Sequence, residues 1–201
     1  DNAFLPGALS AMARELALDP ELDFVFADYE LVRDDGSREV IRTGPVHDLA
    51  ERNTVGACFL YRRALAEKVG SYDPGRNLAE DWDWWRRARL HGNMARLARV
   101  LYAYGDTPDS LTRQQAAAVQ HASMELTGIG RDPARRHEYR RQLALLAAAY
   151  KAGGQPWRSM GVAWQLLRQR PWGGAGWWAL TRALLPMPLL KVTRRMRGLN
   201  D

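Results

Sequence analysis

Three carboxylates stand close together in the middle of this 201-residue chain, at Glu80, Asp81 and Asp83, with tryptophans between and after them. A carboxylate held in the first turn of a helix can accept a proton from a hydroxyl group or bind a divalent cation. The helix macrodipole and capping alone also favour acids in a first turn, by roughly 0.3–1 kcal/mol each. The residue types by themselves therefore favour a structural role, and chemistry needs support from the rest of the chain.

Other side chains could complete a site around these acids. Trp82 and Trp85 are three positions apart and share a helix face, so they either pack in the core or offer a ring to a sugar. Asp28 follows an apolar run and either faces a ligand or makes a polar contact within the protein. Arg87 either binds phosphate or belongs to a solvated, charged face. The sequence leaves each of these pairs of alternatives open.

The elements that must position these residues form an α/β region followed by helices only. Gly70 and Gly92 are predicted to end two helices, and the Asp-Asp-Gly turn at 34–36 joins two strands. We place the boundary at 1–112 for the α/β region and 113–201 for the helical region. The expected fold class is a mixed sheet with flanking helices, then an all-α extension. The predicted helices are 6–18, 63–69, 80–90, 111–127, 132–152, 157–170 and 176–185, and the predicted strands are 23–32, 38–42, 55–61 and 96–104.

Composition narrows the class of protein. Hydrophobic residues make up 46% of the chain, which is enough for a buried core. No run of about 18 apolar residues predicts a membrane span, and no signal peptide is visible. The single cysteine, Cys58, fits a reducing compartment and excludes a zinc site built from cysteines. We therefore expect a cytoplasmic location, including the inner face of the membrane.

Charge is distributed unevenly along the chain. Residues 1–130 carry a net charge of −5, whereas residues 131–201 carry +11, which together give the overall +6. The basic end, at 189–197, follows leucines and tryptophans, a pattern that can lie in an anionic membrane interface. A helical bundle with a solvated basic surface is the alternative. Without a recognition motif, nucleic acid is not an expected partner.

An ordered set of motifs resembles the second half of a family 2 inverting glycosyltransferase domain, which has the GT-A fold. Residues 1–9 read Asp-Asn-Ala-Phe-Leu-Pro-Gly-Ala-Leu, similar to the end of the family's aspartate motif and the helix after it. Residues 27–30 read Ala-Asp-Tyr-Glu, and 53–63 resemble the acceptor-side strand. Gly-Ser-Tyr-Asp at 70–73 and Glu-Asp-Trp-Asp at 80–83 follow in the family's order. The set covers residues 1 to about 112.

The resemblance implies a function and a set of roles. It implies transfer of a sugar from a nucleotide-sugar donor to an acceptor hydroxyl of a glycan or lipid-linked acceptor, in cell-surface glycan synthesis. It assigns the catalytic base to Asp81 beside Glu80, and a ligand of Mg²⁺ or Mn²⁺ to Asp1. Asp28, Trp82, Trp85 and Arg87 are the expected substrate-binding residues. Because the chain opens within the motif set, we expect it to be an N-terminally truncated fragment.

One departure from the family pattern motivates an alternative function. Many relatives end this domain with Tyr-Arg-x-His-x-x-Ser, and the histidine can assist the metal. Here Gly105 and Thr107 stand at the arginine and histidine positions, which puts metal binding by this segment in doubt. The alternative is a non-catalytic helical interaction module, or a membrane-surface binding module, that carries a degenerate α/β domain.

Overall fold

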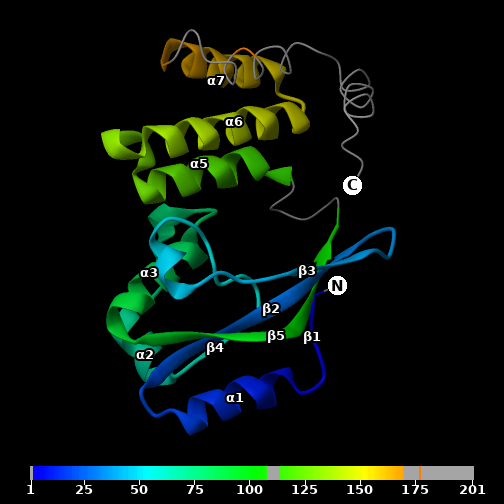
Figure 1. The fold of residues 1–201 in the computed structure, drawn as a ribbon, viewed down its shortest axis with the longest axis vertical. Coiled ribbons are helices and arrows are strands. Elements are labelled where there is room, and N and C mark those ends of the chain that lie inside the picture. Colours follow the sequence, from blue (N-terminus) through cyan, green and yellow to red (C-terminus); the bar gives the residue numbers. More distant parts are fainter. Residues whose placement is uncertain (1, 108–113, 170–176, 178–201) are drawn as a thin grey trace. The chain divides into compact units, whose positions relative to one another are not determined.

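The computed structural model describes residues 2–107, 114–169 and 177. The chain divides into two compact units, Asp1–Arg113 and Gln114–Asp201. The first is a mixed sheet with flanking helices, and the described part of the second is helical, which confirms the predicted fold class (Figure 1). Within the described residues, no helix combines the length and the apolar composition needed to cross a bilayer.

A five-stranded sheet organises the first unit. Its strands are β1 (Ala3–Phe4), β2 (Leu22–Arg33), β3 (Arg38–Ile41), β4 (Phe59–Tyr61) and β5 (Asn93–Asp106). The order is β1-β5-β2-β3, with β4 also paired to β2. The two long strands, β2 and β5, run parallel, and the other pairings are antiparallel. Figure 1 shows β2 and β5 side by side through the unit.

Helices cover both faces of this sheet. Successive residues of β2 point to opposite sides, so its apolar side chains pack against helices on each face. Val25 and Ala27 pack with Met12 and Leu16 of α1 (Ala8–Leu18) on one face. On the other face, Phe24 stacks on the ring of Phe59, with centroids 5.7 Å apart. This second face is where α2 (Arg63–Val69) and α3 (Glu80–His91) pack (Figure 1).

The sequence located most of these elements and missed the short ones. The strand predicted over 55–61 forms only as β4, its last three residues, because 55–58 lie in an irregular segment. The two-residue β1 and the 3₁₀ helices η1 (Val46–Ala50) and η2 (Pro74–Arg76) were not predicted. Such elements are too short for a hydrophobic period to reveal them.

The second unit is described from Gln114 onward. It contains α5 (Ala116–Thr127), η3 (Ile129–Arg131), η4 (Pro133–Arg135), α6 (Arg136–Ala152) and α7 (Pro156–Gln169). The Oγ of Ser159 donates to the carbonyl of Ala147 at 2.7 Å and ties α7 to α6. The helix predicted at 176–185 falls almost wholly outside the described residues. In the described part of this unit, one hydrophobic core cluster contains Met124, Ile129, Leu143, Leu146, Ala163 and Leu166.

Candidate active site

The first turn of α3 carries the three acids singled out in the sequence. Its N-cap residue, Ala79, makes no side-chain hydrogen bond that caps the helix. The three acids of the first turn therefore supply the negative charge that the positive end of the helix dipole favours. Leu78, just before the cap, has φ of 68°, in the left-handed region that a leucine rarely adopts. This strained backbone conformation lies two residues before Glu80, and such outliers cluster at functional sites.

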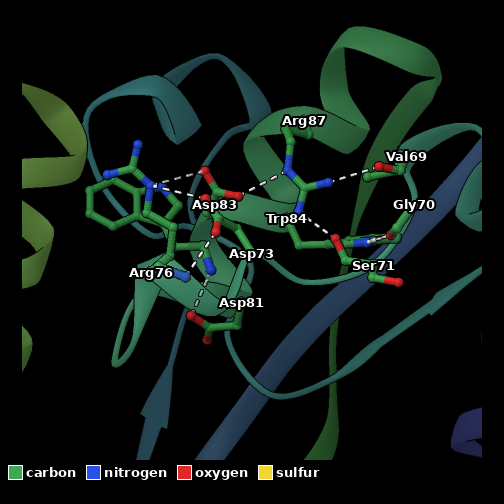
Figure 2. A network of polar contacts seen from close by, with 11 residues as sticks. Val69, Gly70, Ser71, Asp73, Arg76, Asp81, Asp83, Trp84 and Arg87 are labelled. Atoms are coloured by element: carbon green, nitrogen blue, oxygen red, sulfur yellow. Dashed lines mark hydrogen bonds and ion pairs between the residues drawn. The ribbon is translucent and has the colours of Figure 1, made fainter.

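Asp81 is half-buried, neither sealed in the core nor turned into bulk solvent. Its Oδ1 accepts from the backbone N–H of Trp82 at 2.6 Å (Figure 2). Burial raises the pKa of Asp81, the Trp82 N–H opposes that shift, and the negative charge of Glu80 adds to it. A carboxylate with a raised pKa holds an abstracted proton more firmly, which is what a general base at neutral pH requires.

A half-exposed tyrosine responds to the charge of these carboxylates. Tyr72 is 49% exposed, and its ring packs against buried Trp84 with centroids 6.1 Å apart. Burial raises the pKa of Tyr72, and Tyr61 and the negative charges of Asp81 and Glu80 raise it further. Tyr72 is therefore an exposed aromatic side chain within electrostatic range of the carboxyl pair. Its position in the Gly-Ser-Tyr-Asp motif is the signal that sequence reasoning could have used, but no binding role was predicted for it.

A polar network fixes the loop that carries Tyr72. Arg87 donates from Nε to Asp83 at 2.9 Å, from Nη1 to the carbonyl of Val69 at 2.8 Å, and from Nη2 to that of Ser71 at 3.0 Å (Figure 2). Arg76 adds longer contacts, 3.7 Å to Asp73 and 4.0 Å to Asp83. The structure thus places Arg87 as a loop-positioning residue, and its contact with substrate stays a prediction.

Both tryptophans predicted to bind substrate lie in the core. Trp82 donates its indole N–H to the carbonyl of Leu49 at 2.8 Å. Trp85 packs edge-on against Phe59, with centroids 5.5 Å apart. Each ring is at most 4% exposed, so neither offers a face to a sugar. Core packing therefore replaces stacking on a sugar as the interpretation of these two residues, because Trp82 is buried against η1 and Trp85 against β4.

Asp28 is also occupied by the protein itself. Its Oδ1 accepts from the backbone N–H and Oγ1 of Thr43 at 2.9 and 2.8 Å. Arg96 donates to both carboxylate oxygens, with Nη2 2.6 Å from Oδ2. With this carboxylate buried and bound by Thr43 and Arg96, the polar-contact alternative holds and the ligand-facing one does not.

The metal site expected at Asp1 falls outside the described residues. Its neighbour Asn2 accepts from the backbone N–H of Gly105 at 3.0 Å, and β1 pairs with β5 through Ala3 and Ala103. The chain next to Asp1 therefore lies beside the end of β5, where Gly105 has no side chain to offer a metal. Among the described residues, no three of His, Cys, Asp and Glu gather closely enough to hold an ion.

Nucleophilic catalysis by cysteine is not supported. Cys58 is fully buried between the sheet and α1, and burial raises the pKa of its thiol to about 11. A thiol with that pKa is protonated at neutral pH and is a weak nucleophile.

Comparison with known proteins gives one relevant similarity. No protein-family model matches the chain. The chain is 30% identical over 122 residues to an uncharacterized glycosyltransferase, YwdF, of Bacillus subtilis (strain 168). The match covers 55% of this chain and 44% of the relative, so the chain spans less than half of that relative's length. This distant homology supports a relationship to glycosyltransferases in general.

Proposed function

We propose that the protein containing this chain is an inverting glycosyltransferase, and that residues 1–112 form the acceptor-side half of its GT-A domain. The observation that carries this proposal is Asp81, half-buried, with a raised pKa, beside Glu80 and the exposed ring of Tyr72. The distant relative named a glycosyltransferase supports the reaction class. The ordered motifs around Asp81 support the family and the inverting stereochemistry.

In the proposed reaction, Asp81 accepts the proton of the acceptor hydroxyl. The hydroxyl oxygen forms a bond to the anomeric carbon while the bond from that carbon to the diphosphate breaks. The nucleoside diphosphate leaves with the bonding electron pair, and attack from the opposite side inverts the configuration. Glu80 raises the proton affinity of Asp81 through its charge. Because Glu80 is exposed, its carboxylate is also free to orient the acceptor.

The donor side of this proposal rests on the start of the chain. Asp1 is proposed as an oxygen ligand of Mg²⁺ or Mn²⁺, the ions that oxygen donors suit. Such a cation neutralises charge on a departing diphosphate. The pairing of β1 with β5 supports this placement, because it ties the residues after Asp1 to the sheet of the same unit.

The acceptor is proposed to be a glycan or a lipid-linked sugar in cell-surface glycan synthesis, at the cytoplasmic face of the membrane. A sugar acceptor suits a half-exposed aromatic ring beside a carboxylate pair. Contact of the basic residues 189–197 with anionic lipid is part of this proposal, and it rests on sequence, because those residues lie outside the described part.

Substitution of Asp81 in the natural protein tests this function. Asp81→Asn keeps the shape of the side chain but cannot accept the proton, so transfer should fall by at least about a hundredfold. Donor binding, measured by calorimetry, should stay within about twofold. Glu80→Gln should give a smaller loss, and Asp34→Asn, in the exposed turn after β2, should give none. Normal turnover by the Asp81 variant would refute the assignment.

A second function is favoured by the end of β5. Gly105 lacks the arginine side chain that many relatives carry there, which fits a non-catalytic module with a degenerate α/β domain. Nucleotide-sugar hydrolysis or transfer by the wild-type protein, lost in Asp81→Asn, would eliminate this alternative.

A further inference from the structure

Helix α7 presents two large aromatic side chains to solvent. Trp157 is 80% exposed and Trp164 is 56% exposed. They are seven residues apart, so they lie on the same face of the helix with about 10.5 Å between them along its axis. The opposite face is buried against α6 through Ser159, Ala163 and Leu166. Two adjacent exposed tryptophans on one stripe are a sign of an interaction surface.

Gly161 separates the two indoles on this stripe. A Cβ built on Gly161 would meet no atom within 4 Å, so the surface between the rings is open. Glycine costs a helix interior roughly 1 kcal/mol relative to alanine. Because position 161 has no side chain, nothing projects between the two rings, and both indoles can reach the same flat surface.

The charge around the stripe identifies the kind of surface. Helix α7 contains no Asp or Glu. Arg168 continues the stripe one turn beyond Trp164, and Arg158 flanks Trp157. Residues 114–169 hold eight Lys or Arg and three Asp or Glu. A basic setting complements an anionic partner, and tryptophan beside arginine is typical of helices that lie at the level of lipid headgroups.

We propose that this stripe of α7, formed by Trp157, Gly161 and Trp164, docks on an anionic phospholipid surface. The two indoles enter the headgroup region while the arginines meet lipid phosphates. The surface differs from the basic residues 189–197 considered above, and it lies in the described part of the chain. The inference does not depend on glycosyltransferase activity.

Vesicle binding by the whole chain tests the proposal. The probes are vesicles of phosphatidylcholine alone and of phosphatidylcholine mixed with phosphatidylglycerol in equal parts, with co-sedimentation as the measurement. We expect binding to the mixed vesicles and little to the neutral ones. Trp157→Ala/Trp164→Ala should weaken the binding by roughly tenfold or more, because neither indole remains to enter the headgroup region.

A matched double variant controls for the loss of exposed apolar surface. Leu90 is 80% exposed on α3 and Leu145 is 50% exposed on α6, close to the values of the two tryptophans. Leu90→Ala/Leu145→Ala should bind the mixed vesicles as the wild type does. All four side chains are exposed, so both double variants should keep the wild-type melting temperature. A lower melting temperature for the tryptophan variant alone would show that the chain itself covers the stripe, and would overturn the proposal.

Substitutions at Gly161 test whether the bound surface is negatively charged, and they leave both tryptophans in place. The site accepts a side chain, so Gly161→Glu and Gly161→Lys should both fold. The glutamate variant should bind mixed vesicles several-fold more weakly than the lysine variant. Equal binding by these two, or wild-type binding by the tryptophan double variant, would overturn the proposal. So would a failure of the wild-type chain to bind the mixed vesicles.

Discussion

The carboxylate of Asp28 on β2 is held by the guanidinium of Arg96 on β5, with Nε 3.0 Å from Oδ1 and Nη2 2.6 Å from Oδ2. The parallel strand pair brings these residues together across 68 positions of sequence. Thr43, just after β3, binds the same carboxylate, so one buried side chain ties three segments together. This relationship makes Asp28 a structural residue.

Removing this carboxylate should destabilise the first unit. Asp28→Ala leaves Arg96 and the Thr43 N–H without their partner, which should lower the unfolding free energy by about 3 kcal/mol. Urea unfolding followed by circular dichroism measures the loss. Glu39→Ala is the matched control, because it breaks the exposed ion pair with Arg33 and should cost less than about 1 kcal/mol. Equal losses in the two variants would contradict the structural role of Asp28.

The raised pKa of Asp81 predicts a pH-dependent gain in stability on substitution. Because the folded-state pKa is raised, the native state binds the proton more tightly than the unfolded state, and ionisation of Asp81 opposes folding. Asp81→Asn should therefore melt at a higher temperature than wild type at neutral pH. This gain should shrink as pH falls through the folded-state pKa of Asp81 towards the usual range of a carboxyl group. Melting curves over a pH series check the prediction.

The control for that experiment is Asp34→Asn, which makes the same change of charge in an exposed turn. It should show no comparable gain at neutral pH. A gain for Asp81→Asn that persisted unchanged into acid would point to a cause other than ionisation.

Gly56 should tolerate no side chain. Its φ is +74°, and an added Cβ would lie 2.7 Å from Cε1 of the Tyr29 ring. Gly56→Ala should lower the unfolding free energy by about 2–3 kcal/mol, from backbone strain and from crowding together. Gly36 is the matched control: φ is +80°, but no atom lies within 4 Å of its Cβ position, so Gly36→Ala should cost only about 1 kcal/mol. An equal loss of unfolding free energy in the two variants would show that crowding against the Tyr29 ring adds nothing to the cost.

Tyr72 should affect the acceptor and not the donor. If its exposed ring stacks on a sugar beside Asp81, Tyr72→Ala should raise the KM for the acceptor by roughly tenfold and leave the donor KM unchanged. Tyr72→Phe should stay near wild type, which separates the ring from the hydroxyl. Leu9→Ala removes an equally exposed apolar side chain from α1, on the other face of the sheet, and should change neither constant. Initial-rate kinetics with each substrate varied in turn decide this, and a donor effect from Tyr72→Ala would contradict the assignment.

Local patterns predicted the long elements but not the environment of each side chain. Helix α2 was located at its observed bounds, since its apolar spacing and the Gly70 stop are both local signals. In contrast, Trp82 and Trp85 share a helix face in either interpretation, so spacing could not separate core packing from a sugar site. The contact of Trp85 with Phe59 of β4 and the hydrogen bond from Trp82 to the carbonyl of Leu49 decided it.

The sequence by itself determined the two kinds of unit, the order of their long helices and strands, and the carboxylates at the start of α3, because hydrophobic period, glycine stops and residue type act within a few positions. Only the tertiary structure decided which acids are paired with a buried partner and which remain partly open to solvent. Asp28 meets Arg96 through strand pairing, whereas Asp81 is half-buried next to Tyr72 with a raised pKa. Desolvation and ion pairing depend on what surrounds a group in space, and those neighbours come from distant parts of the chain.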